Sequence, residues 1–160
     1  MLVIADRCTD EPSQVVREAG VTCGERTSGE GVKGAAIAWG IQEASRIGLQ
    51  FDALIILDAD TRVNPGLLNA FRRGASQGHK VQQAFNYVSN PWETAFTRVI
   101  AVTSMLKNGL FYTGKSLIGL SGMLQGTGMC LSRAIVDRYG WNAFSVGEDW
   151  EFSVSLLLAG

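Results

Sequence analysis

Apolar runs with the length of β-strands alternate along this chain with stretches whose apolar residues recur every three or four positions. The first pattern predicts strands and the second predicts helices. The expected strands cover residues 2–5, 21–23, 53–57, 80–88 and 129–131. The expected helices follow Pro12, Lys33, Asn64, Pro91, Ser132 and Glu148. This alternation predicts a single α/β domain over residues 1–160, with a mostly parallel sheet flanked by helices.

The helical pattern after Pro91 is long and apolar. Its apolar residues lie three or four positions apart, so they share one helix face, which we expect to pack against the core. They are Phe96, Val99, Val102 and Leu106. Charged and amide side chains interrupt the apolar stretch 99–124, which therefore resembles an amphipathic helix and a loop more than a membrane span. A membrane-facing surface is the alternative for this stretch.

Composition restricts the function more than the fold. Apolar residues make up 46% of the chain, charged residues 18%, and the formal net charge is −1. These values are typical of a globular domain and give no basic excess for nucleic acid. The single histidine excludes a multi-histidine metal site. Three cysteines without C-x-x-C spacing, and no basic leader before the first apolar run, predict reduced thiols and a cytoplasmic location.

Two carboxylates, Asp58 and Asp60, follow the expected strand 53–57. Residues two apart in an extended chain point to the same side, so both side chains can face one point. Two like charges that close together need a cation, and a hard divalent ion is the usual one. The alternative is that both aspartates only open a turn and cap the next helix. The pair by itself leaves both interpretations open.

Asp6 is a candidate for the same edge of the sheet as Asp58 and Asp60, and Lys33 is a candidate for an anion site at a helix start. Ligands of open α/β sheets bind at the carboxyl ends of the strands, and Asp6 ends the expected strand 2–5. Its carboxylate could accept hydrogen bonds from a nucleobase or a ribose. Lys33 begins a helix after a glycine-bearing loop, where backbone N–H groups favour anions. An ordinary surface loop is the alternative there.

Two later stretches complete the set of candidates. Gly126 and Gly128 leave bare backbone beside a short strand, which suits either a closely bound ligand or a tight turn. Glu148 and Asp149 open the last helix. Capping and the helix dipole explain one carboxylate there, and the second suggests a catalytic base.

Taken together and in this order, these stretches resemble a family 2 glycosyltransferase of the GT-A fold. The matching segments are Val3-Ile4-Ala5-Asp6-Arg7-Cys8-Thr9-Asp10, Lys33-Gly34-Ala35-Ala36, Asp58-Ala59-Asp60, Gln125-Gly126-Thr127-Gly128-Met129-Cys130 and Glu148-Asp149. The resemblance implies a Rossmann-like sheet in which residues 2–4 match the family's second strand. The chain is therefore expected to be a fragment that lacks the first strand and the C-terminal region.

The resemblance also implies a role for each candidate on the donor side. Asp6 would contact the uracil of a UDP-sugar, and Lys33 would lie near the nucleotide. Asp58 would lie against the ribose and diphosphate, and Asp60 would hold Mg²⁺ or Mn²⁺. Such an ion neutralises the charge that develops on a diphosphate leaving group.

On the acceptor side, the resemblance implies that Gly126 and Gly128 line the sugar and acceptor region. Asp149, next to Glu148, would be the general base. A base on the face opposite the leaving group gives in-line displacement and inversion at the anomeric carbon.

The sequence therefore predicts a metal-dependent inverting glycosyltransferase that moves a sugar from a nucleotide sugar to a polysaccharide or glycolipid acceptor. By resemblance, the full-length protein would act at the inner face of a membrane, with which regions outside this sequence would associate. Two alternatives stay open. One is a catalytically incomplete nucleotide-sugar-binding module, and the other is a sugar-nucleotide nucleotidyltransferase.

Overall fold

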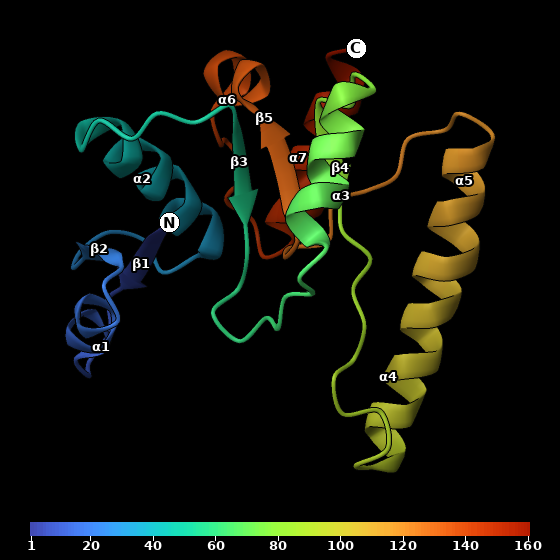
Figure 1. Ribbon diagram of the computed structural model, residues 1–160, viewed down its shortest axis with the longest axis horizontal. Helices are drawn as coiled ribbons and strands as arrows, with labels where there is room; N and C mark the ends of the chain where they lie inside the picture. The colour runs from blue at the N-terminus through green and yellow to red at the C-terminus, as the bar shows by residue number, and fades with distance from the viewer.

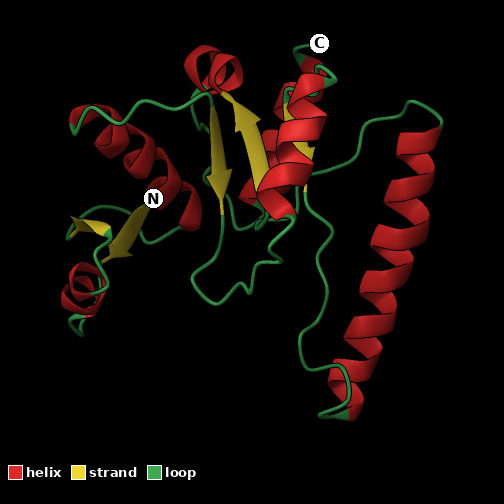
Figure 2. Ribbon diagram, viewed as in Figure 1, coloured by secondary structure: helices red, strands yellow, loops and turns green.

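The computed structural model describes residues 1–160 and shows an α/β architecture built on two separate sheets (Figure 1, Figure 2). Its strands are β1 (Leu2–Asp6), β2 (Thr22–Arg26), β3 (Ala53–Ile56), β4 (Val81–Gln83) and β5 (Met129–Ser132). Its helices are α1 (Pro12–Glu18), α2 (Lys33–Arg46), α3 (Leu67–Ser76), α4 (Ala95–Met105), η1 (Leu106–Tyr112), α5 (Thr113–Leu117), α6 (Arg133–Tyr139) and α7 (Glu148–Leu158). The elements follow the predicted order, and the strand expected over 80–88 is shortened to its first part.

The first sheet is a parallel pair formed by β1 and β2, in register over their whole length. Helices α1 and α2 pack against it. The contact with α2 is close, because a Cβ added at Gly24 would lie 3.0 Å from the ring of Trp39. Ile37 and Ile41 of α2 pack against the core of the second sheet. Helix α2 therefore joins the two sheets.

The second sheet has the strand order β3-β5-β4, and β5 runs antiparallel to both of its neighbours. The prediction of a mostly parallel sheet was therefore wrong. Strands β3 and β4, which are separated in the chain by α3, do run in the same direction, as expected for a strand–helix–strand unit. Strand β5 comes later in the chain and inserts between them. A pattern of apolar runs cannot show where a later strand inserts.

The core lies between this second sheet and helices α2, α6 and α7. Met129 and Leu131 of β5 are fully buried. Trp141 stacks on Phe152 of α7, with the ring centroids 4.4 Å apart. This packing fixes the positions at which β5 and α7 begin, and candidate site residues lie at both of these ends.

Helices α4, η1 and α5 form one continuous helix over residues 95–117, which stands apart from both sheets in Figure 1. The face predicted to pack against the core is exposed, with Phe96 at 72% and Val99 at 64% exposure, so that prediction was wrong. The opposite face contacts the segment after β4, where Asn108 Nδ2 donates a hydrogen bond to the Asn86 carbonyl (3.0 Å). Helical spacing identifies a face but does not say what covers it. None of the helices has the length and hydropathy needed to cross a bilayer.

Candidate functional site

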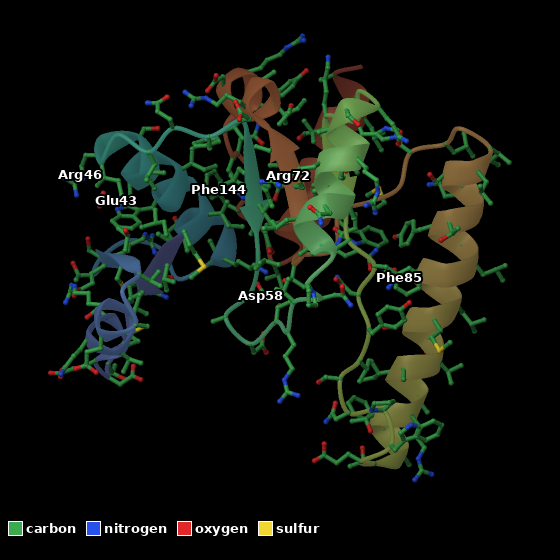
Figure 3. All side chains as sticks on the ribbon, in the orientation of Figure 1. Glu43, Arg46, Asp58, Arg72, Phe85 and Phe144 are labelled. Carbon is green, nitrogen blue, oxygen red and sulfur yellow. The ribbon has the colours of Figure 1, made fainter.

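Lys33, the first residue of α2, contacts two other parts of the fold. Its Nζ forms an ion pair with Asp58 in the turn after β3, and it donates a hydrogen bond to the Gly126 carbonyl at 2.7 Å. The Lys33 and Asp58 side chains are still 35% and 39% exposed, so a ligand can reach both. Figure 3 shows Asp58 just beyond the end of β3. The fold thus brings together three candidates that lie far apart in the sequence.

The segment around Asp58 is a turn. The Thr61 amide donates to the Asp58 carbonyl (3.0 Å), and the Asp58 amide donates to Thr127 Oγ1 (3.0 Å). The hydroxyls of Thr61 and Thr127 share a hydrogen bond of 2.9 Å. Because β3 ends at Ile56 and a turn begins at Asp58, the extended chain that was expected to point Asp58 and Asp60 to the same side is absent. Asp60 lies exposed in this turn and forms no hydrogen bond or ion pair.

The glycine-bearing loop before β5 is held by Gln83 of β4. Gln83 Nε2 donates to the Thr127 carbonyl (2.8 Å), and its Oε1 accepts from the Gln125 amide (2.8 Å). Gly126 and Gly128 have φ values of 78° and 70°, in the left-handed region that favours glycine. A Cβ at Gly128 would also lie 2.8 Å from a neighbouring side-chain carbon. The tight turn predicted as one alternative is therefore present, and it presents the Gly126 carbonyl to Lys33.

The carboxylate of Asp149 lies next to this loop. A Cβ added at Gly126 would lie 3.6 Å from Asp149 Oδ2 and also 3.6 Å from Lys33 Nζ. Asp149 is half-buried, and its Oδ1 accepts a hydrogen bond from the Trp150 amide (2.8 Å). Glu148 is buried at 7% exposure and forms no hydrogen bond or ion pair. Of the two adjacent acids, Asp149 is thus the one that solvent and a substrate can reach.

A third acid of α7, Glu151, organises the loop that leads into the helix. Its carboxylate accepts hydrogen bonds from the amides of Ser145 (3.0 Å) and Phe144 (3.1 Å). Hydrogen bonds from Ser145, and then from Phe144, hold the pKa of Glu151 below its ordinary value. Glu151, which the sequence did not single out, therefore fixes the approach to the acidic pair.

Tyr112 is a further residue that sequence reasoning missed. Burial raises the pKa of its hydroxyl, and the negative charge of Asp149 raises it further. Tyr112 lies four residues after Asn108, on the side of the 95–117 helix that contacts the body of the protein. That spacing is the one sequence signal that could have found it. The negative charge of Asp149 thus acts on this helix through Tyr112.

Asp6 belongs to a separate cluster at the end of β1. Its carboxylate pairs with Arg26 Nη1 of β2 at 2.5 Å, and Arg7 Nε lies 3.7 Å away. Arg26 is buried at 7% exposure and also donates to the Glu30 carbonyl (2.9 Å). The parallel register places Arg26 directly opposite Asp6, which a prediction of the pairing could have shown. No hydrogen bond or ion pair joins this cluster to Lys33.

The carboxylates of Asp58 and Asp60 fit a divalent-metal site only if a bound substrate supplies further ligands. No three His, Cys, Asp or Glu side chains gather into a group that could hold an ion by themselves. Mg²⁺ in proteins commonly takes one or two carboxylates, with substrate phosphates and water as the other ligands. Asp60 is exposed and unpaired in this structure, whereas Asp58 is already paired with Lys33. An ion completed by substrate phosphates and water is therefore compatible with these residues, among which Asp60 has an unpaired carboxylate.

An α/β domain with carboxylates and a lysine gathered beyond the carboxyl end of a strand is typical of enzymes that bind nucleotides. Residues 53–160 match the Glycosyl transferase family group 2. The chain belongs to this family, whose fold is GT-A, and whose members act on a sugar donor and an acceptor. The match contains Asp58, Asp60 and the acidic pair of α7, whereas Asp6 and Lys33 precede it. No curated protein sequence matches the chain.

Proposed function

We infer that this chain is the catalytic domain of a metal-dependent inverting glycosyltransferase, with a UDP-sugar as donor and a polysaccharide or glycolipid as acceptor. The observation that carries this function is the convergence of Lys33, Asp58, Gly126 and Asp149. The ammonium of Lys33 and the carboxylates of Asp58 and Asp149 meet there, beyond the end of β3. The family match supports sugar transfer over nucleotidyl transfer.

On the donor side, Lys33 would place a positive charge beside the diphosphate, at a helix N-terminus that also favours anions. Asp58 is paired with Lys33. When a bound ligand also contacts Lys33, Asp58 would accept hydrogen bonds from the ribose. Asp60 would hold Mg²⁺ or Mn²⁺, which when bound stabilises the diphosphate leaving group as a Lewis acid. Asp6, held by the buried Arg26, would receive the uracil.

On the acceptor side, Asp149 would accept the proton of the attacking hydroxyl. Its half-exposed carboxylate borders the loop of Gly126 and Gly128, which would line the space for the sugar. Because a single base serves the attacking hydroxyl, displacement would be direct and would invert the anomeric centre. Buried Glu148 would support the position of α7 and is the second candidate acid. The full-length protein would carry out this reaction at the cytoplasmic side of a membrane.

The base assignment is tested by Asp149→Asn. General-base catalysis contributes about 10²–10⁴-fold to a rate, so transfer from UDP-sugars should fall by that factor. Binding of UDP, followed by calorimetry, should be retained. Asp137→Asn is the matched control, because Asp137 is an exposed helical acid paired with Arg133, away from the site. Full transfer activity in Asp149→Asn would refute the base role.

The metal assignment is tested by Asp60→Ala. Calorimetry should show that UDP binding no longer depends on Mn²⁺ in this variant. Asp52→Ala is the control, since Asp52 is an exposed aspartate at the opposite end of β3. An unchanged Mn²⁺-dependent affinity in Asp60→Ala would contradict the assignment.

An incomplete nucleotide-sugar-binding module is the second candidate. The two sheets form no strand pairing with each other, and no ready-made metal cage is present. Mn²⁺-dependent UDP binding without any hydrolysis or transfer, across a panel of UDP-sugars and glycan acceptors, would favour this candidate over the enzyme.

A further inference from the structure

The helix over residues 95–117 has its polar side turned toward the protein and its apolar side toward solvent. Side chains on its inner side are small or polar, and Thr97, Ala101 and Ser104 are partly buried. Asn108 on the same side is buried and hydrogen-bonded to the segment after β4. We call the exposed apolar residues of the opposite side the outer stripe. The outer stripe consists of Phe96, Val99, Val102, Leu106, Leu110 and Leu117.

The body of the protein leaves this stripe uncovered. The chain exposes 10540 Å², whereas a compact monomer of 17.2 kDa exposes about 7,800 Å². Figure 1 shows the helix standing apart from the body, with its α4 part extending past both sheets, and Figure 3 shows Phe85 in the space between the body and the helix. Phe85 lies on the inner side, near Gly109. An apolar stripe about 30 Å long therefore needs a partner outside the described chain.

The charged residues of the helix itself have one sign, and Glu93 is the acid that precedes it. Residues 94–136 contain no aspartate or glutamate, and the helix carries Arg98, Lys107 and Lys115. The chain as a whole has a net charge of −1, so this helix is a local positive region. Lys107 Nζ lies 5.7 Å from the Tyr112 ring centroid, and Lys115 Nζ lies 5.6 Å from the Phe111 ring centroid. The Lys115 ammonium thus lies beside the exposed ring of Phe111, whereas the Lys107 ammonium lies beside Tyr112 on the side that contacts the body.

We propose that the outer stripe lies in the surface of a lipid bilayer that contains anionic lipids, with the helix parallel to the membrane plane. A helix with an apolar face and basic flanks binds at such a surface, because its apolar residues enter the acyl boundary and its cations meet the headgroups. Trp92, exposed at 79% just before the helix, is a residue type that favours the headgroup region. Charges within the helix exclude a spanning orientation.

Charge also distinguishes this partner from a second copy of the chain. Two copies that met through the outer stripe would bring two sets of three cations together, with no acid on either helix to offset them. An anionic lipid surface supplies the missing negative charge. The proposal does not depend on the proposed function, because no donor or acceptor takes part in membrane binding. If both hold, Tyr112 would connect the membrane-bound helix to the region of Asp149.

The test is flotation of the 160-residue chain with vesicles of phosphatidylcholine alone and of phosphatidylcholine with phosphatidylglycerol in equal amounts. The chain should bind the anionic vesicles and bind the neutral ones at least tenfold more weakly. Val99→Ser with Leu106→Ser should reduce binding at least tenfold, since both side chains would be removed from the apolar contact. Replacing the three basic residues of the helix by glutamine should reduce binding to anionic vesicles about a hundredfold, at about fivefold for each charge.

The matched control replaces two exposed apolar residues on other helices, Val15→Ser of α1 with Leu68→Ser of α3. It should bind vesicles as the parent chain does. Circular dichroism shows that each variant is folded, and all four substituted positions are exposed, so folding should be preserved. Equal binding by the stripe variant and the parent would overturn the proposal. So would an equal loss in the control, or a dimer seen by sedimentation that the stripe variant abolishes without any vesicle binding.

Discussion

The close packing of α2 against the loop before α7 makes a quantitative prediction at Gly34. A Cβ at this buried position would lie 1.9 Å from the Ala143 carbonyl oxygen and 3.1 Å from Trp141 Nε1. That same carbonyl accepts a hydrogen bond from Trp141 Nε1 at 3.0 Å. The contact is with backbone rather than with a flexible side chain, so Gly34→Ala requires α2 or the loop to move by about 1 Å.

The expected effect is a loss of stability. Overpacking of a well-packed interior costs about 1–3 kcal/mol, and weakening the indole hydrogen bond adds about 1 kcal/mol. Alanine in place of glycine stabilises a helix by about 1 kcal/mol, which offsets part of this loss. The free energy of unfolding of Gly34→Ala should therefore fall by about 2 kcal/mol, which lowers Tm by about 4–8 °C for a chain of this size.

Urea unfolding followed by tryptophan fluorescence measures this difference. Gly114→Ala is the matched control, because it makes the same change inside a helix where a Cβ would meet nothing within 4 Å. The control should be stabilised by about 0.5–1 kcal/mol. If Gly34→Ala lies within about 0.5 kcal/mol of the parent or is stabilised like the control, the close approach of α2 to this loop is refuted. The shift in α2 should also weaken UDP binding, because Lys33 begins that helix.

Three further predictions concern the surroundings of the site. The lowered pKa of Glu151 means that its carboxylate stabilises the fold above the ordinary carboxyl pKa, and that this contribution is lost as the pH falls through the folded-state pKa. Glu151→Gln should therefore lose less stability between pH 6 and pH 3 than the parent, and identical acid profiles would contradict this. Burial raises the pKa of the Cys130 thiol. A thiol reagent at pH 8 should therefore modify exposed Cys8 quickly and Cys130 only after unfolding. Fast reaction of Cys130 would contradict this and show that β5 is accessible. Gln83→Ala should lower the free energy of unfolding by about 2 kcal/mol, at about 1 kcal/mol for each of two hydrogen bonds to the 125–128 loop, and an unchanged value would mean that other contacts hold the loop.

Local sequence signals predicted the elements well and their pairing poorly. The helix over 33–46 begins at the predicted residue, because apolar spacing and the glycine-bearing loop before it are local features. The strand after Lys80 ends at Gln83, opposite Met129 at the start of β5, because the residues before Met129 form the tight turn of Gly126 and Gly128 instead of a longer strand. The antiparallel insertion of β5 was missed for the same reason, because pairing depends on segments far apart in the chain.

For the candidate site, too, the sequence indicated individual residues but not their contacts. The sequence proposed Asp58, Lys33 and the acidic pair of α7 as candidates, yet it could not show that Lys33 pairs with Asp58. The extended geometry assumed for the two aspartates failed, because a turn with its own hydrogen bonds begins at Asp58. Arg26 was missed because its partner lies on another strand, opposite Asp6.

The sequence by itself determined the order of the helices and strands and which helix faces are apolar. These properties depend on neighbours three or four residues apart, whereas the roles of the candidate acids and of Lys33 came from the family resemblance. Only the tertiary structure decided that β5 separates β3 from β4, that Lys33 lies between Asp58 and Gly126, and that the apolar face of the 95–117 helix meets solvent. Hydrophobic periodicity is the same for a helix face that packs on the core and for one that is exposed. The packing of the whole chain decides which of the two a given face is.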